Sequence, residues 1–228
     1  MSLFNKSASY YDAIYAVAGK DYESESRDQA MTRTRAGNLT ERFDLTSLEN
    51  RLLRRAPLPQ SDLPVASVAV IINPEDRGGS LLLIKRTERE GDPWSGQIGF
   101  PGGHKSPSDQ DFLQTAIRET EEEVGIVLSQ HLLLGSLPLV TTLSRRVQVA
   151  PFVFALKSIV AVQLNREVAE NFWLSLSDLM RLQVKRRKMR VEEADLEVDS
   201  YDYQGRIIWG LTFRILNLLL DRRLEDHS

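Results

Sequence analysis

Cysteine is absent from this chain of 228 residues. Its absence excludes a disulfide framework, a thiolate zinc site and a cysteine nucleophile. The chain also has no apolar run near the roughly 18 residues that cross a membrane, and its N-terminus does not have the pattern of a secretory signal. We therefore expect no membrane association and a cytoplasmic location.

An excess of positive charge is missing as well. Lysine and arginine number 29 against 32 aspartates and glutamates, which gives a formal net charge of −3. Proteins that bind nucleic acid usually carry a basic domain, so this balance argues against a DNA or RNA partner. With 42% hydrophobic residues, the chain is long enough for one domain with a full core and too short to favour two.

The chain divides by composition into three parts. Residues 1–30 are rich in tyrosine, serine and charge without sustained periodicity, which predicts a mobile N-terminal extension or a short helix. Residues 31–64 form a lead-in: leucines among charges at 40–55 predict a short amphipathic helix, and several prolines then indicate a linker. Residues 65–228 carry the patterns of a folded domain.

The folded domain begins with β-strand patterns. VASVAVIIN and SLLLIKR are apolar runs separated by PEDRGG, which predicts a hairpin, and LLLGSLPLVTTL, RRVQVAPFVFAL and VAENFWL predict further strands. Helical patterns return near the end, in a short segment at Leu176–Leu182 and an apolar-faced one at Leu211–Leu220. The sequence therefore predicts an α/β (α+β) fold in which a mixed sheet is sandwiched between helices.

Residues 102–126, which read GGHKSPSDQDFLQTAIRETEEEVGI, are the most informative stretch. At about 100° per residue along a helix, Glu119, Glu122 and Glu123 lie within roughly 100° of one another, beside a separate apolar stripe. Carboxylates this close repel one another and raise each other's pKa, and a bound divalent cation would relieve the repulsion. Because Mg²⁺ prefers oxygen ligands, the pattern indicates a metal site.

A glutamate-rich helix is more often a solvated surface, here with an Arg118–Glu122 pair at i,i+4. The context of this helix favours the metal site. The run FPGG precedes it, and Ser108 or Asp109 is predicted to cap its start. Gly125 stands where a helix commonly ends in a left-handed residue.

This stretch resembles the Nudix hydrolases, whose box reads Gly, five residues, Glu, seven residues, and then Arg-Glu-apolar-any-Glu-Glu-any-Gly-apolar. The second half is present as RETEEEVGI from Arg118, with Thr120 in the apolar position. In the first half, the interval from Gly103 to Arg118 is one residue longer than usual, and Gln110 stands where the glutamate is expected. Asp109 then becomes the substitute carboxylate.

The longer loop looks like the Nudix branch that contains coenzyme A diphosphatases. The resemblance covers roughly residues 65 to 222 and includes LLIKR at 82–86, PFV at 151–153, ENFW at 170–173 and IWGLT at 208–212. Coenzyme A members carry a basic residue four positions before the glycine that matches Gly96, whereas this chain has Asp92. We therefore expect coenzyme A to be a poor substrate, and Asp92→Arg to raise its turnover selectively.

The resemblance implies a Mg²⁺- or Mn²⁺-dependent hydrolase that cleaves the diphosphate linkage of a nucleoside diphosphate derivative. Glu119, Glu122 and Glu123 would bind the metal together with the backbone carbonyl of Gly103. Glu119 and Glu122 would also be catalytic, with Glu119 deprotonating or orienting the attacking water. Arg118 would hold the glutamates through charge-assisted hydrogen bonds and so share in catalysis.

Weaker candidates lie outside the box. Lys105, Arg86 and Arg89 are predicted to contact substrate phosphates, and a distal acid is sought among Glu192, Glu193 and Glu197. His104 is expected to be solvated, and Trp94 and Trp209 to lie in the core, with Trp209 at a strand-to-helix junction. The basic run at 185–188 is expected on an exposed hairpin or helix edge.

Three functions remain open from the sequence. The first is the diphosphate hydrolase, with a small-molecule substrate such as a coenzyme A-like compound, an ADP-ribose-like compound or a dinucleotide. The second releases pyrophosphate from oxidised nucleoside triphosphates and needs the same metal site. The third is a nucleotide-sensing module without catalysis, which retention of all three box carboxylates disfavours. The sequence is compatible with a homodimer.

Removal of residues 1–30 should leave turnover nearly unchanged. The segment lacks core periodicity and precedes every motif described above, and chain ends that bury little surface tolerate removal. The test compares kcat/KM and the thermal midpoint of the full chain with those of a chain that starts at Met31. A large loss of either would mean that the segment packs on the domain or on a partner subunit.

Overall fold

The computed structural model describes residues 45–54, 65–74, 78–92, 94–142, 147–158, 160–191 and 194–222. The predicted extension at residues 1–30 and the proline-rich linker lie outside the described residues. The described part of the lead-in contains α2 (Leu45–Arg51), in agreement with the predicted amphipathic helix. Leu48 and Leu52 are buried in the main hydrophobic cluster.

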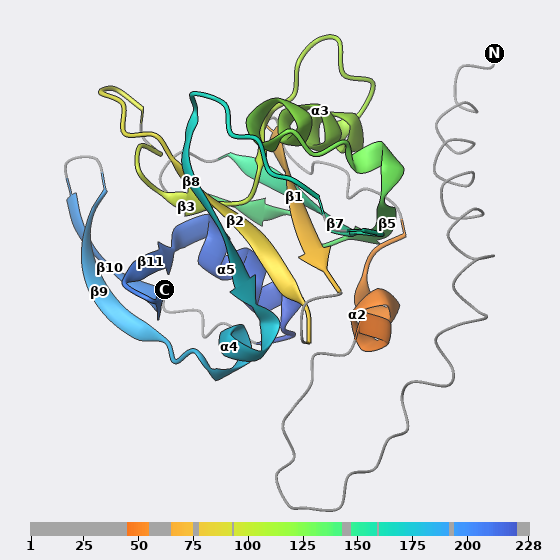
Figure 1. Ribbon diagram of the computed structural model, residues 1–228. Helices are drawn as coiled ribbons and strands as arrows, with labels where there is room; N and C mark the ends of the chain where they lie inside the picture. The colour runs from red at the N-terminus through yellow and green to blue at the C-terminus, as the bar shows by residue number, and fades with distance from the viewer. Residues whose placement is uncertain are drawn as a thin grey trace, which may run out of the picture. The chain divides into compact units, whose positions relative to one another are not determined.

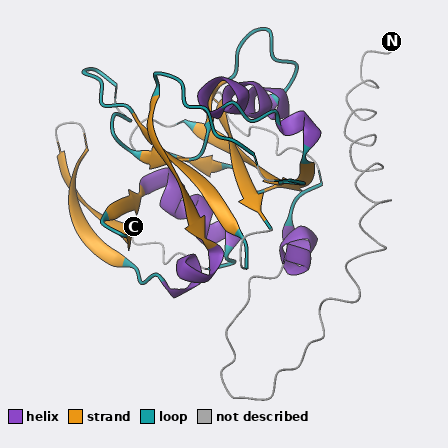
Figure 2. Ribbon diagram, in the orientation of Figure 1, coloured by secondary structure: helices purple, strands orange, loops and turns teal. Residues whose placement is uncertain are grey.

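A large mixed sheet forms the centre of the domain (Figures 1 and 2). In the described part of the chain its order is β3-β2-β1-β7-β5, with β4 paired to β1, β6 to β7 and β8 to β2. β1 and β7 are parallel, whereas β1 and β2 form the predicted antiparallel hairpin. The strands are β1 (Val65–Asn73), β2 (Ser80–Arg86), β3 (Ile98–Gly99), β4 (Gly102–His104), β5 (Leu132–Ser136), β6 (Val140–Thr141), β7 (Gln148–Ala155) and β8 (Val168–Ser175).

Helices cover both faces of this sheet (Figure 2). The long helices are α3 (Phe112–Val124), which contacts β1, β4 and β7, and α5 (Gly210–Leu219), which contacts β3 and β6. The short helical elements are η1 (Leu128–Gln130) and α4 (Leu176–Arg181). Alternate residues of β1, including Val68 and Val70, join the cluster that contains α5, while Ala69 is equally buried on the other face. The predicted sandwich of helices around a mixed sheet is therefore confirmed.

A second, three-stranded sheet was not predicted from the sequence. Its strands are β9 (Lys185–Val191), β10 (Ala194–Tyr203) and β11 (Arg206–Trp209), in the order β11-β10-β9. Cross-strand ion pairs hold the basic β9 to the acidic β10, among them Arg186 to Asp199 at 3.4 Å and Arg187 to Asp202 at 2.7 Å. The basic run at 185–188 therefore lies on a hairpin edge, and Lys185, Arg186 and Arg187 form ion pairs within the sheet.

The N-terminal cap of α3 differs from the prediction, whereas its C-terminal end agrees with it. The helix is capped by Asp111, whose Oδ1 accepts a hydrogen bond from the Gln114 amide at 2.8 Å, and not by Ser108 or Asp109. At the other end Gly125 is left-handed with a φ of 70°, as predicted. None of the helices in the described residues is long and apolar enough to cross a membrane.

Candidate active site

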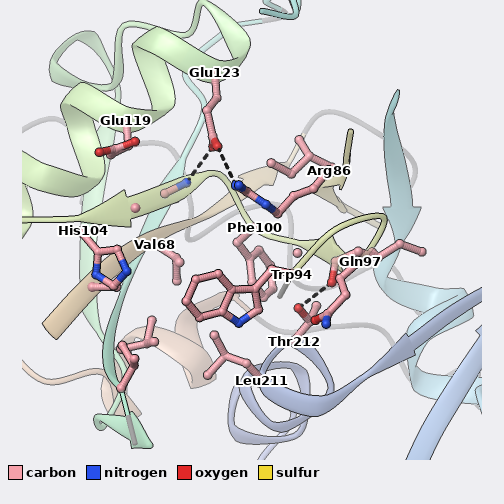
Figure 3. A pocket seen from close by; sticks show the side chains of 18 of the residues that line it. Val68, Arg86, Trp94, Gln97, Phe100, His104, Glu119, Glu123, Leu211 and Thr212 are labelled. Atoms are coloured by element: carbon pink, nitrogen blue, oxygen red, sulfur yellow. Dashed lines mark hydrogen bonds and ion pairs between the residues drawn. The ribbon is translucent and has the colours of Figure 1, made fainter. Parts of the chain in front are cut away.

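A cavity of about 310 Å³ lies between α3, the β4 strand and the start of α5 (Figure 3). Glu119 and Glu123 line one end of it, and Trp94, Phe100 and Leu211 line the other. One end is therefore acidic and the other is apolar and aromatic. Such a combination suits a ligand with a charged group joined to an organic one.

Glu123 is the most buried carboxylate at the acidic end, with only 3% of its side chain exposed. Its Oε2 accepts a hydrogen bond from the Gly102 amide at 2.9 Å, and its Oε1 lies 3.5 Å from Nη1 of Arg86. Burial raises the pKa of Glu123 to about 7, and the Gly102 amide and Arg86 offset only part of this rise. A nearby cation would stabilise the charged form of this buried carboxylate.

Glu119 lies directly against Gly103. A Cβ atom at position 103 would stand 2.5 Å from Cδ of Glu119, so the glutamate reaches this place only because residue 103 has no side chain. Burial raises the pKa of Glu119, and hydrogen bonding and charge from Arg118 counteract the shift. Glu119 and the backbone of Gly103, which was predicted to supply a carbonyl ligand to the metal, therefore lie side by side.

Arg118 organises the acidic side of α3. Its Nε and Nη2 donate to the two carboxylate oxygens of Asp109, each at 2.9 Å, in a bidentate pair. Nη2 also lies 2.8 Å from Glu119, and Nη1 donates to Glu122 at 3.2 Å. The Arg118 guanidinium holds the pKa of the buried Asp109 carboxyl well below its usual range. Asp109 is therefore the carboxylate that anchors the box arginine, while Gln110 is exposed.

The three box glutamates do not converge equally. Glu122 is 56% exposed and turns toward Arg118, whereas Glu119 and Glu123 both line the cavity. Within the described residues no three His, Asp or Glu side chains are already arranged as a metal-binding group. Glu119 and Glu123 still fit a divalent cation, because they are hard oxygen donors with raised pKa values that line the same cavity. Glu122 lies at the exposed edge of this pair.

Among the residues predicted to bind phosphate, the structure brings only Arg86 to the cavity. Arg89 donates instead to the Arg166 carbonyl at 3.1 Å and pairs with Glu167 at 3.6 Å. Lys105 donates to the Asp109 carbonyl at 2.6 Å and so ties its own loop together.

One acid that lines the cavity was not predicted from the sequence. Glu167, in the loop before β8, lines the cavity, and its charge contributes to the raised pKa of Glu123. Glu197 lies exposed on β10 opposite Lys188 and is not among the lining residues, and Glu192 and Glu193 lie outside the described residues. The only sequence signal for Glu167 is its place immediately before a predicted strand.

Two tryptophans that were expected in the core also depart from that expectation. Trp94 is half-buried and lines the cavity instead of the core, with its ring centroid 6.1 Å from that of His104, which lines the cavity as well. Trp209 does stand at the predicted strand-to-helix junction, as the last residue of β11 and the cap of α5, but it is only half-buried. The loop that carries Trp94 folds over the cavity, which local sequence patterns do not reveal.

The mixed sheet, the acidic helix and the glycine loop that meets it define a protein of the Nudix type. The family model of the NUDIX domain matches residues 63–194, and the chain belongs to this family. The uncharacterized Nudix hydrolase NudL of Photorhabdus laumondii is 33% identical over 186 residues, which cover 78% of this chain and 96% of that protein. The protein is accordingly a Nudix-type pyrophosphohydrolase.

Another relative and a solved structure are also similar to this chain. The uncharacterized Nudix hydrolase NudL of Yersinia enterocolitica is 32% identical over 155 residues, which cover 67% of this chain and 76% of that protein. Among solved structures, a C. elegans Ap4A hydrolase binary complex aligns with a TM-score of 0.44 at 24% identity, covering 52% of this chain and 85% of that chain.

Proposed function

We propose that this protein is a divalent-metal-dependent hydrolase that cleaves the diphosphate linkage of a nucleoside diphosphate derivative. The observation that carries the proposal is that one cavity has Glu119 and Glu123 at one end and Trp94, Phe100 and Leu211 at the other. A diphosphate placed at the acidic end leaves its organic group against the apolar walls. The cavity volume of about 310 Å³ is at the lower end of the range for small-molecule sites.

Each residue at the acidic end has a distinct task in this proposal. Mg²⁺ or Mn²⁺, when bound, neutralises charge on the diphosphate oxygens. Glu119 and Glu123 hold the ion, with Glu122 supplying further negative charge at the exposed edge. Glu119 also orients the attacking water and accepts its proton, since it combines access to the cavity with a raised pKa.

Two arginines complete the acidic end. Arg118 fixes the direction of Glu119 and Glu122 because its guanidinium is itself anchored on Asp109. Arg86 reaches the cavity from β2 and faces the substrate phosphates. It is the one lysine or arginine that lines this cavity in the described part of the chain.

Coenzyme A is expected to have a kcat/KM at least about tenfold below that of the better of ADP-ribose and NADH, or about 1.4 kcal/mol. Its 3′-phosphate needs a further cation, whereas Arg86, the one lysine or arginine that lines this cavity in the described residues, is assigned to the diphosphate. The measurement is product release from coenzyme A, ADP-ribose, NADH, dinucleoside polyphosphates and oxidised dGTP with Mg²⁺ and with Mn²⁺, each beside a sample treated with chelator.

The same panel separates the alternatives. Coenzyme A as the best substrate would mean that Arg86 serves its 3′-phosphate after all. Pyrophosphate release mainly from oxidised dGTP would favour the triphosphate hydrolase. Nucleotide binding without metal-dependent turnover of any compound would favour the sensing module and contradict the proposal.

A further inference from the structure

Asp92 lies behind the cavity wall and touches two residues that form it. Its Oδ2 accepts a hydrogen bond from Nη2 of Arg86 at 3.1 Å, and its Oδ1 accepts one from the Trp94 amide at 2.9 Å. Only 17% of the side chain is exposed, and Asp92 itself is not among the lining residues. One carboxylate therefore connects the cation at the acidic end with the backbone of Trp94, whose side chain lines the organic end.

Arg86 depends on this contact for its position. Its guanidinium lies between two carboxylates, with Nη2 on Asp92 and Nη1 3.5 Å from Glu123 (Figure 3 shows the Glu123 side). Its Nε is buried and has no hydrogen-bond partner among the described residues, so the guanidinium is oriented there by its contacts with Asp92 and Glu123. Without Asp92, Glu123 would be the remaining charged partner and would draw the guanidinium toward itself.

The loop that carries Trp94 is held by backbone hydrogen bonds in addition to the bond between its Trp94 amide and the Asp92 carboxylate. The Ser95 amide donates to the Asp92 carbonyl at 3.1 Å, and the Gln97 amide donates to the Trp94 carbonyl at 3.1 Å. The Arg86 amide then donates to the Gln97 carbonyl at 3.0 Å, which joins the end of the loop to β2. Burial raises the pKa of Asp92, but the Trp94 amide and Arg86 outweigh it and keep the pKa below its usual value. The carboxylate is thus ionised at neutral pH.

We infer that Asp92 is a positioning residue for substrate binding, which sets Arg86 for the phosphates and Trp94 for the organic group at the same time. The inference rests on the proposed function for the identity of the ligand. It also changes the expectation for Asp92→Arg. The new guanidinium would lie against Arg86, so we expect weaker binding of every substrate in the panel, and no selective gain for coenzyme A.

The test uses two variants of Asp92 with the full chain. Asp92→Asn keeps an oxygen acceptor for the Trp94 amide and removes the charge that faces Arg86, whereas Asp92→Ala removes both. We expect Asp92→Asn to raise KM for the best substrate of the panel about tenfold and to change kcat less than about threefold. In an Arg86→Gln background the same substitution should change KM less than about twofold, because its effect passes through Arg86.

Glu88→Gln is the matched control. Glu88 lies in the same loop and pairs with Lys85 at 3.5 Å, but 79% of its side chain is exposed and it does not line the cavity. Its KM should stay within about twofold of that of the natural protein. If Asp92→Asn leaves KM unchanged, the inference is overturned, whether kcat also stays unchanged or falls about tenfold.

Failure of the proposed function is distinguishable from failure of this inference. If the natural protein hydrolyses no compound of the panel, the proposed function is wrong, and the variants are compared by calorimetric titration with ADP-ribose. Asp92→Asn should then raise Kd about tenfold and Glu88→Gln should not. No ADP-ribose binding to the natural protein, or equal Kd values in both variants, would overturn the positioning role.

Discussion

Glu123→Gln is expected to lower kcat/KM at least about 100-fold, or about 2.7 kcal/mol of transition-state stabilisation, while the protein stays folded. Glutamine keeps the size of the side chain and an oxygen that accepts the hydrogen bond from the Gly102 amide. It removes the negative charge that would hold a divalent cation at the buried end of the cavity. The measurement is kcat/KM with Mg²⁺ and with Mn²⁺, beside the thermal midpoint of both proteins.

Neighbours of Glu123 on α3 supply the comparison. The box pattern predicts a similar loss for Glu122→Gln, through its charge at the edge of the site. Glu121→Gln is the matched control, because Glu121 is exposed on the same helix and does not line the cavity, and its kcat/KM should stay within about twofold. Activity within a few-fold of the natural value for Glu123→Gln would mean that the metal is held elsewhere.

Asp109→Ala is expected to lower the free energy of unfolding by about 3 to 5 kcal/mol and to abolish most activity. The substitution leaves the Arg118 guanidinium without its bidentate partner, and it also removes the acceptor of the Ser106 amide and of the Thr115 hydroxyl. Glu119 and Glu122 then lose the fixed arginine that orients them. Denaturant unfolding and kcat/KM are the measurements, and Asp109→Asn serves if the alanine variant does not fold.

The pH for this comparison follows from the direction of the pKa shift. The pKa of Asp109 is lower in the folded protein than the ordinary value of 3.8, so its stabilisation is fully present above that value. It decreases as the pH falls below about 4. Measurements at pH 7 therefore report the whole contribution.

Asp111→Ala tests whether the role of Asp109 as the anchor of Arg118 differs from that of an ordinary helix cap. Asp111 caps α3 and does not contact Arg118, so its removal should cost about 1 kcal/mol and leave kcat/KM within about threefold. Similar losses of stability and activity in the two alanine variants would contradict the anchoring role of Asp109.

Local patterns determined much of this protein. The acidic helix after the glycine loop, its end at Gly125 and the hairpin of β1 and β2 follow from periodicity and turn chemistry, which depend on residues close in the chain. The family resemblance follows from the same stretch. β9 and β10 could not be predicted in this way, because their facing segments are strongly charged and pair through backbone hydrogen bonds and ion pairs between strands, with Tyr201 and Tyr203 as β10 side chains in the core.

Only the tertiary structure decided how the site is assembled. Helical spacing puts three glutamates on one side of α3, but burial against Gly102 and Gly103 selects Glu119 and Glu123 for the cavity and leaves Glu122 outside. The same holds for Asp92, which the sequence marks only as a negative charge and the fold pairs with Arg86. Spacing along a chain fixes the face on which a side chain stands, whereas its partners and its exposure to water depend on what the rest of the chain packs against that face.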